Sequence, residues 1–415
     1  MKIAILFALL FWDSATLADV TAVPGEFIVK VKPNKILFQS GSTQIGNSSF
    51  YFTKTSPNKT LLSFKSALST SKNDIDYIEP NYIYHSTDLI RGKIVNDVNF
   101  SDNWNIQNQN NKNADIHVID LWREGIIGNQ KIIVAIIDSG YDYQHPDLKK
   151  NLYTNTREIP DNGIDDDGNG YIDDVHGWNF INNTPNANDD DGHGTHCAGT
   201  IGAEANNNFG IAGINWNVSI LPLKFLDSKG YGDTRNAILA IEYARKMGAK
   251  IINASWGGDP YSQALADAIS EANKENILFV TSAGNNGMDN DKTPFYPANL
   301  QIPNIISVAA SDEYDRLPSY SNYGAKSVHI SAPGNNIFST FLQDSFESLS
   351  GTSMAAPQIS GVAALLISKE PTLTPFQIRE RLMKTSDPVN LQGRVNAYNA
   401  IHKIFPVRNN VWISN

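Results

Sequence analysis

The stretch KIIVAIIDSG, residues 131–140, places an uninterrupted apolar run directly before an acidic residue and a glycine. Such runs are typical of parallel strands that are buried on both faces of a sheet. Similar runs occupy residues 218–226, 250–255 and 276–283. Apolar residues spaced by three and four predict helices between them, at residues 233–248 and 261–276. This alternation predicts an α/β domain with a doubly wound, mostly parallel sheet.

The beginning of the chain, MKIAILFALLFWDSATLADV, has a lysine at position 2, an apolar run from Ile3 to Trp12, and small residues near Ala18. This pattern is typical of a secretory signal peptide, so we expect residues 1–18 to be removed. The alternative is a membrane anchor, but the apolar run has roughly half of the ~20 residues that a bilayer requires. We therefore expect a secreted protein, extracellular or periplasmic, that leaves the membrane after signal cleavage.

Residues 19–90 form a distinct segment in which GEFIVKVKPN and DIDYIEPNYIYH predict strands, and LLSFKSALS has helical spacing. The segment is therefore expected to be a small α+β unit. Residues 91–115 are rich in asparagine and lack periodicity, which indicates a linker and the N-terminal segment of a larger domain at residues 116–415. The single cysteine, Cys197, rules out an internal disulfide.

The formal net charge of −10 argues against a nucleic-acid partner, because phosphate contacts require clustered lysine and arginine. Residues 161–191 hold nine aspartates and neither lysine nor arginine, so a bound cation would relieve their repulsion. Within them, DDDGNGYIDD alternates oxygen-bearing side chains in the manner of a calcium loop, although the closing glutamate is missing. The predicted ligands are Asp165, Asp167, Asn169 and Asp173, with Gly170 at the turn. A solvated acidic loop is the alternative, and no organic cofactor is expected.

Ligands bind doubly wound sheets at the carboxyl ends of the strands, where Asp138 and Asn285 follow two of the predicted strands. Ser353 precedes a small-residue helix, and His193 lies in DDGHGTHCAGTIGA. Alone, Asp138 could be a turn residue and Ser353 a helix N-cap. Together, a carboxylate, an imidazole and a serine hydroxyl are what nucleophilic catalysis requires. The Ser353 backbone N–H and the Asn285 amide could then bind an oxyanion.

Four motifs, IIDSGYDYQHPDL, DDGHGTHCAGTIGA, VTSAGNNG and SGTSMAAPQISG, closely resemble those of the subtilisin-like serine proteases, the subtilases. The resemblance implies a serine endopeptidase that acts through an acyl-enzyme. Asp138 would orient His193, His193 would be the general base and then acid, Ser353 the nucleophile, and Asn285 an oxyanion donor. His196 is expected to be structural, and Cys197 to be buried.

The resemblance also implies that a protein or peptide substrate is held as an added β-strand. The matching edges are Gly230, Tyr231 and Gly232, and Ser255, Trp256 and Gly257. On pattern alone, these are equally a loop and a strand end. Trp256 would line the primary pocket and Phe295 would reach its floor, which indicates an apolar or medium-sized preference.

A second calcium site, implied by the resemblance alone, would use Asp147 and Asn207 with an N-terminal ligand that the sequence does not identify. Residues 19–90 resemble the inhibitor-like propeptide of the family. The chain is thus expected to be a monomeric zymogen that cleaves itself between His85 and Asn96.

Two rival functions differ in class from a serine protease. One is a non-catalytic, secreted calcium-binding scaffold of the same fold. The presence of the required residue type at all four predicted catalytic positions argues against it. The other is a zinc hydrolase built on His193 and His196. Its usual motif has histidines at i and i+4 with a glutamate after the first, whereas these histidines are at i and i+3 and Gly194 follows the first.

Overall fold

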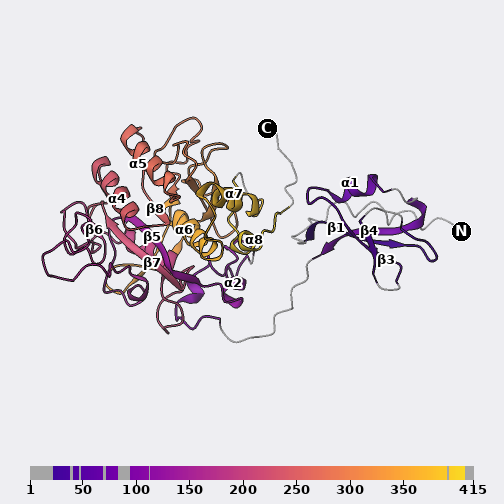
Figure 1. Ribbon diagram of the computed structural model, residues 1–415, viewed down its shortest axis with the longest axis horizontal. Helices are drawn as coiled ribbons and strands as arrows, with labels where there is room; N and C mark the ends of the chain where they lie inside the picture. The colour runs from indigo at the N-terminus through magenta and orange to yellow at the C-terminus, as the bar shows by residue number, and fades with distance from the viewer. Residues whose placement is uncertain are drawn as a thin grey trace. The chain divides into compact units, whose positions relative to one another are not determined.

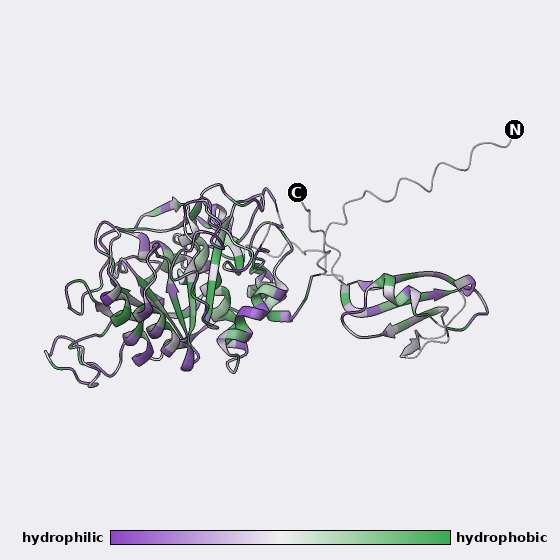
Figure 2. Ribbon diagram, turned by 90° about the horizontal axis from the view of Figure 1, so that it is seen from above, coloured by the Kyte–Doolittle hydropathy of each residue, from purple (hydrophilic) through white to green (hydrophobic). Residues whose placement is uncertain are grey.

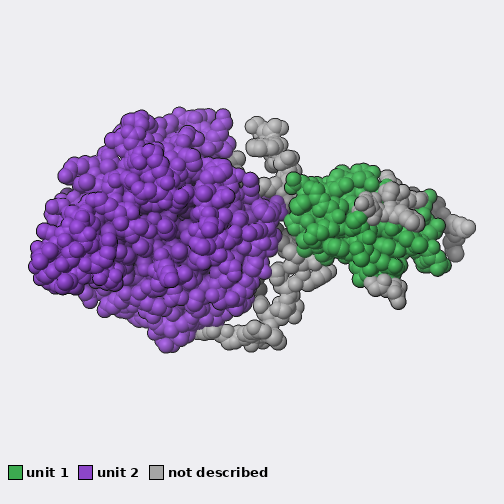
Figure 3. Space-filling model, viewed as in Figure 1, with its two compact units in different colours: residues 1–91 green, residues 92–415 purple. Residues whose placement is uncertain are grey.

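The computed structural model describes residues 22–37, 41–45, 48–68, 72–82, 94–111, 113–389 and 392–406. The chain divides into two compact units, residues 1–91 and 92–415 (Figure 3). The predicted signal peptide lies outside the described residues. Val95 and Ile106, from the predicted linker, are buried in the main core of the larger unit. In the part of the chain that the structure describes, no helix has the length and apolarity needed to span a bilayer.

The smaller unit is an antiparallel sheet with one short helix (Figure 1). Its strands, in the order β2-β3-β1-β4, are β1 (Ala22–Val31), β2 (Ser42–Gln44), β3 (Phe50–Lys54) and β4 (Ile75–Tyr82). Helix α1 (Leu61–Ser66) begins after Thr60, whose hydroxyl accepts a hydrogen bond from the backbone N–H of Ser63. Phe64 stacks on Phe27 with ring centroids 4.4 Å apart, and both are buried, so this pair forms the centre of a separate small core.

A parallel sheet in the order β11-β10-β9-β8-β5-β7-β6 organises the larger unit. Its strands are β5 (Gly128–Asp138), β6 (Trp178–Asn179), β7 (Asn217–Lys224), β8 (Ile251–Ala254), β9 (Leu278–Ser282), β10 (Ile305–Ser311) and β11 (Ile330–Pro333). An antiparallel ribbon, β12 (Ile337–Thr340) and β13 (Phe346–Leu349), stands apart from this sheet. The α/β fold class with a large parallel sheet, predicted from the apolar runs, is confirmed.

Helices cover both faces of this sheet. The evidence is that alternate residues of β5 belong to two different hydrophobic cores. Val134 and Ile136 belong to the core that contains α3 and α6, whereas Ala135 and Ile137 belong to the core that contains α4 and α5. This explains why the strand is apolar at successive positions.

The helices of the larger unit are α2 (Ile119–Arg123), α3 (His193–Gly202), α4 (Thr234–Lys246), α5 (Gln263–Lys274), α6 (Thr352–Lys369), α7 (Pro375–Thr385) and α8 (Ala397–His402). Short 3-10 turns cover Lys72–Asp74, Phe100–Asp102 and Lys149–Asn151. Figure 2 shows hydrophilic residues concentrated on the outer loops and helices.

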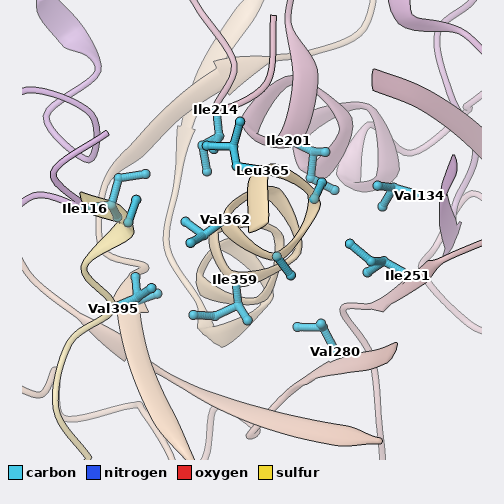
Figure 4. Packing of buried hydrophobic residues seen from close by; sticks show 14 of the residues in the cluster. Ile116, Val134, Ile201, Ile214, Ile251, Val280, Ile359, Val362, Leu365 and Val395 are labelled. Carbon is cyan, nitrogen blue, oxygen red and sulfur yellow. The ribbon is translucent and has the colours of Figure 1, made fainter. Parts of the chain in front are cut away.

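Helix α6 lies at the centre of the larger core (Figure 4). Ile359, Val362 and Leu365 are fully buried and are surrounded by side chains from the sheet and from α3. A Cβ atom on Gly361 would lie 2.8 Å from Cδ1 of Ile214, so only glycine permits this close packing. Because the helix is enclosed on all sides, its first residues are held firmly against the sheet.

The carboxyl ends of the central strands form one edge of the sheet. β5 ends at Asp138 and β7 at Lys224, while β8 and β9 lead into Ser255 and Gly284. From β5 the chain moves to β7 on one side and then returns to β8 on the other, so the strand order reverses at β5. Such a reversal opens a crevice in which α/β proteins bind their ligands.

Candidate active site

Asp138 and His193 form a hydrogen-bonded pair at this edge. The Asp138 carboxylate is fully buried and accepts a hydrogen bond from Nδ1 of His193 at 2.7 Å. The same oxygen accepts the backbone N–H of Ser139 at 2.7 Å. Burial lowers the pKa of His193, but the charge and hydrogen bond of Asp138 outweigh it and raise that pKa to about 9. With Nδ1 held in this way, Nε2 is the nitrogen left to exchange a proton.

Gly194 makes the approach of these two residues possible. A Cβ atom on Gly194 would lie 2.3 Å from the carbonyl oxygen of Gly140 and 3.2 Å from Cβ of Asp138. The backbone N–H of Gly194 also donates to Oγ of Ser139 at 2.8 Å. The glycine that follows His193 is therefore needed for α3 to begin against the end of β5.

Ser353, the second residue of α6, and His193 both lie beside the thiol of Cys197. The Cys197 Sγ is within 4.8 Å of a ring nitrogen of His193 and 3.6 Å from the Ser353 carbonyl oxygen. The Ser353 hydroxyl donates to the carbonyl oxygen of Ser255 at 3.0 Å, and among the described residues no hydrogen bond joins it to His193. Hydrogen bonds between catalytic groups are often long or misaligned when no substrate is bound.

The side chain of Asn285 is held by the residue before Ser353. Its Oδ1 accepts hydrogen bonds from the backbone N–H and the hydroxyl of Thr352, each at 2.8 Å. These contacts assign the carboxamide oxygen to Thr352 and leave Nδ2 as a donor beside the N-terminus of α6. Asn285 is exposed, so this donor is accessible to a substrate.

The two segments predicted to hold substrate lie on either side of Phe225. The ring of Phe225 contacts Trp256 with centroids 4.7 Å apart, and a Cβ atom on Gly232 would lie 2.7 Å from the same ring. Tyr231, next to Gly232, is 72% exposed. Trp256 is fixed by a 2.8 Å hydrogen bond from Nε1 to the carbonyl oxygen of Ile137. The structure thus brings together both predicted edges beside the catalytic residues.

The ring of Phe295 closes the space between Gly257 and Gly284. A Cβ atom on Gly257 would lie 2.4 Å from Cε1 of Phe295, and one on Gly284 would lie 3.2 Å from its Cδ1. Gly257 belongs to the segment of Ser255, and Gly284 precedes Asn285. A bulky ring therefore lies between the two segments that flank Ser353.

His196 and Cys197 are buried parts of α3. Nε2 of His196 donates to the carbonyl oxygen of Ile337 at 2.9 Å, and burial lowers the pKa of His196 to about 4, so the ring is neutral. Within the described ranges, His196 joins no cluster of metal-ligating side chains, so it does not pair with His193 as the zinc hydrolase alternative requires. Burial raises the pKa of the Cys197 thiol well above its ordinary value, so it is a poor nucleophile.

The acidic loop gathers three carboxylates, but only one of them was predicted as a calcium ligand. Oxygens of Glu158, Asp167 and Asp174 lie within 4.8 Å of one another. Asn155 donates to both aspartates, at 3.1 and 3.0 Å, and Arg157 pairs with Asp167 at 2.8 Å. Burial raises the pKa of Glu158, and the negative charges of Asp174 and Asp167 raise it further.

The other predicted ligands of this loop have different surroundings. Asp165 accepts the backbone N–H groups of Asn169 and Gly170, and Asp173 accepts those of Asn162 and Gly163. Nδ2 of Asn169 donates to Asp174 at 2.7 Å, which places it beside the cluster. Asp165 and Asp173 therefore shape the loop, whereas Glu158 and Asp174 lie where the sequence did not predict ligands.

Asp147 and Asn207, the predicted second site, are in direct contact. Nδ2 of Asn207 donates to Asp147 at 2.7 Å, and burial raises the pKa of Asp147 to about 7. The carboxylate of Asp97 accepts the backbone N–H groups of Asn206 and Asn207 at 2.9 and 3.1 Å, and its charge contributes to the raised pKa of Asp147. Asp97 is thus the N-terminal acidic residue beside this pair.

Comparison with known proteins identifies the family. The model of the subtilase family matches residues 129–402. The chain belongs to the subtilase family. The resemblance predicted from four short motifs is thereby confirmed, and the match includes all four predicted catalytic residues of this subtilase.

Three relatives illustrate the similarity. A subtilisin-like protease 1 of Plasmodium berghei is 36% identical to this subtilase over 302 residues, which cover 66% of this chain and 50% of that protein. A thermophilic serine proteinase of a Bacillus species is 38% identical over 274 residues, covering 65% of this chain and 61% of that protein. A solved protease structure from Pseudoalteromonas arctica has a TM-score of 0.62 and 25% identity, and covers 75% of this chain and 100% of that one. The subtilase therefore spans about half to three fifths of these two curated relatives.

Several supporting residues of the site were not predicted from the sequence. Ser139 and Thr352 adjoin predicted residues and could have been sought there, because a hydroxyl beside a catalytic group often orients its neighbour. Asp191 accepts the backbone N–H of His193 at 3.1 Å, and its spacing of two residues is typical of an Asx turn. Asp97 and Glu158 carry no such local signal, since each meets its partners only through folding.

Proposed function

We propose that this subtilase is a secreted serine endopeptidase, produced as a self-processing zymogen, that hydrolyses peptide bonds through an acyl-enzyme. The observation that carries the proposal is the 2.7 Å bond from His193 to the buried Asp138, with the Ser353 hydroxyl and the Asn285 amide at the same edge of the sheet. Four functional groups from separate segments are required for this chemistry, and the site supplies each of them.

The reaction begins when the Ser353 hydroxyl turns from the Ser255 carbonyl to Nε2 of His193, which takes its proton as Oγ attacks the peptide carbonyl. The developing oxyanion accepts hydrogen bonds from Nδ2 of Asn285 and from the backbone N–H at the start of α6. His193 then donates the proton to the departing amine. It activates a water molecule that releases the acyl group, while Asp138 stabilises the imidazolium throughout.

Peptide substrates are bound as a strand between the segments of Gly230–Gly232 and Ser255–Gly257, through main-chain hydrogen bonds. The substrate residue that directly precedes the scissile bond has its side chain directed between Gly257 and Gly284. Because Phe295 fills this space, small side chains are preferred at that position. This proposal differs from the apolar or medium-sized preference expected from the sequence.

Calcium is the cofactor that the acidic clusters fit. Glu158, Asp167 and Asp174 would hold one ion, and Asp97, Asp147 and Asn207 a second, since both sets offer the hard oxygen ligands that calcium prefers. In the first set, Arg157 forms an ion pair with Asp167, so among the described residues one positive charge faces three carboxylates. A bound ion would neutralise these carboxylates and stabilise the loops without taking part in the reaction.

A fluorophosphonate probe tests the function directly, because an activated serine attacks its phosphorus, displaces fluoride and becomes phosphonylated. The matured wild-type protein should be labelled, and Ser353→Ala should not be. Absence of labelling in both would favour the non-catalytic scaffold, whereas labelling of Ser353→Ala would place the nucleophile elsewhere. Labelling combined with cleavage of a denatured protein substrate supports the endopeptidase.

A further inference from the structure

Lys224 is a buried cation that no step of the proposed mechanism uses. It is the last residue of β7, it is 2% exposed, and in the strand register it lies opposite Asp138 of β5. An ammonium group is rarely enclosed to this degree unless its charge and its three N–H donors find partners.

The partners of Lys224 belong to three separate segments of the active-site edge. Its ammonium donates to the carbonyl oxygen of Ser139, to that of Leu226 at 2.9 Å, and to the carboxylate of Asp190 at 2.6 Å. Ser139 follows the buried triad aspartate, Leu226 begins the turn that leads to the substrate segment, and Asp190 lies three residues before His193. One side chain thus connects the three loops that build the site.

The charges at this edge explain why a cation is needed. Asp189, Asp190 and Asp191 are consecutive, and Asp138 lies near them behind the imidazole. Asp189 is satisfied by the backbone and hydroxyl of Thr195, at 2.9 and 2.6 Å, while the Asp190 side chain is 56% exposed. Asp138, Asp189 and Asp191 all raise the pKa of His193 through their negative charges, and His193 in turn lowers the pKa of its neighbour His196. Without Lys224, the repulsion among these carboxylates would be less balanced.

We propose that Lys224 is a positioning residue of the catalytic pair. Its ion pair with Asp190 holds the loop of His193 against the strand of Asp138, and its positive charge offsets the surrounding carboxylates. This inference rests on the proposed protease function, because the geometry it protects is that of the His193 base. The carbonyl contacts set the position of the ammonium, and the contact with Asp190 transmits that position to the loop.

The test uses three variants of the full chain. Lys224→Met keeps the length of the side chain but removes its charge and donors, and Asp190→Asn removes the partner charge at an exposed position. Lys250→Met is the matched control, because it removes an exposed lysine that directly precedes β8, at the edge of the sheet opposite the site. For each, the second-order rate of phosphonylation by a fluorophosphonate is measured from about pH 5 to about pH 11, with the melting temperature recorded in parallel.

Lys224→Met should react about ten- to hundredfold more slowly than the control, as expected for a loosened catalytic geometry. The midpoint of its pH dependence should move to higher pH, because loss of a positive charge stabilises the imidazolium. Asp190→Asn should lose less activity, and its midpoint should move to lower pH. These opposite displacements would not arise from a general loss of folding.

Rates within about twofold of the Lys250→Met control, with unmoved midpoints, would overturn the inference. If Lys224→Met does not fold, Asp190→Asn decides the question by the same criterion. A wild-type protein that is not phosphonylated overturns the proposed function and this inference with it. A wild-type protein that is phosphonylated, with variants indistinguishable from the control, overturns this inference alone.

Discussion

The carboxylate of Asp138 and Nδ1 of His193 are joined by a 2.7 Å hydrogen bond across 55 positions of the sequence. The carboxylate is enclosed at the end of a strand, whereas the imidazole retains 25% of its side-chain exposure. The buried charge of Asp138 therefore acts on a single, partly accessible base. The protonation of His193 consequently links the structure of the site to its activity and its stability.

The first prediction concerns pH. His193 must be neutral to accept the Ser353 proton, so kcat/KM should rise with pH through about 9, the pKa that Asp138 imposes on it. Stability should change in the opposite direction. Because the folded-state pKa lies above the 6.5 of an unperturbed histidine, the pair stabilises the fold fully below about pH 6.5. That contribution is lost as pH rises through about 9.

Activity profiles with a peptide substrate and urea unfolding at matched pH values measure both effects. Asp138→Asn should abolish most activity and remove the stabilisation at low pH. A rate that is already constant from neutral pH upward would contradict the raised pKa.

The second prediction concerns processing. Ser353→Ala should leave residues 19–90 attached to the rest of the chain, because the proposed self-cleavage requires the same nucleophile. The cleavage is expected between His85 and Asn96, of which residues 85–93 lie outside the described residues. Gel electrophoresis of the purified product measures the difference in mass. Ser350→Ala, an exposed serine in the same segment, is the control and should mature normally. A shortened product from the pure Ser353→Ala protein would point to another protease.

The third prediction concerns the oxyanion donor. Asn285→Ala should lower kcat by about 10²–10³-fold with little change in KM, because the lost hydrogen bond forms only in the transition state. This magnitude is the one established for the side-chain donor of subtilisin, a member of the same family. Asn286→Ala, at the exposed neighbouring position, should retain activity. If both variants show a lower kcat together with a changed KM, the effect is structural and Asn285 is not an oxyanion donor.

The fourth prediction concerns the primary pocket. Phe295→Ala should allow large residues such as phenylalanine or leucine before the scissile bond, since the ring that separates Gly257 from Gly284 is removed. A peptide-library digest compares cleavage preferences before and after the change. Phe376→Ala, on the 48% exposed phenylalanine of α7, controls for loss of an aromatic side chain. An unaltered preference in Phe295→Ala would place the pocket elsewhere.

The fifth prediction concerns calcium. EGTA should lower the melting temperature, because an ion held at a hundred times its Kd contributes about 2.7 kcal/mol to stability. Glu158→Gln should reduce this response, while Asp165→Asn should preserve it, since only Glu158 belongs to the carboxylate cluster. The reverse result would favour the ligands predicted from the sequence. A melting temperature indifferent to EGTA would remove calcium altogether.

Much of the fold could be predicted because its signals are local. A strand buried on both faces must be apolar throughout, so β5, β7, β8 and β9 were recognisable from their own residues. The helices between them follow from apolar spacing, and the order of strands and helices limits the topology. The positions of Asp138 and Asn285 follow from the rule that ligands bind at strand carboxyl ends.

The carboxylates that come together in the acidic loop could not be predicted from the sequence. Alternating oxygens indicated Asp165 and Asp173, but the folded loop uses their carboxylates to satisfy its own backbone N–H groups. Glu158 approaches Asp167 and Asp174 only because the loop turns back on itself. Local spacing does not show which carboxylates the fold brings together into one cluster.

The amino-acid sequence by itself determined the chemical types, their order and the strands and helices that carry them, because these depend on neighbours along the chain. Tertiary structure alone decided which atoms meet: the bond of His193 to Asp138, the phenyl ring between two glycines, and the ammonium of Lys224 among three loops. Such contacts join residues that are distant in sequence, and burial sets their strength by excluding water from the charges involved.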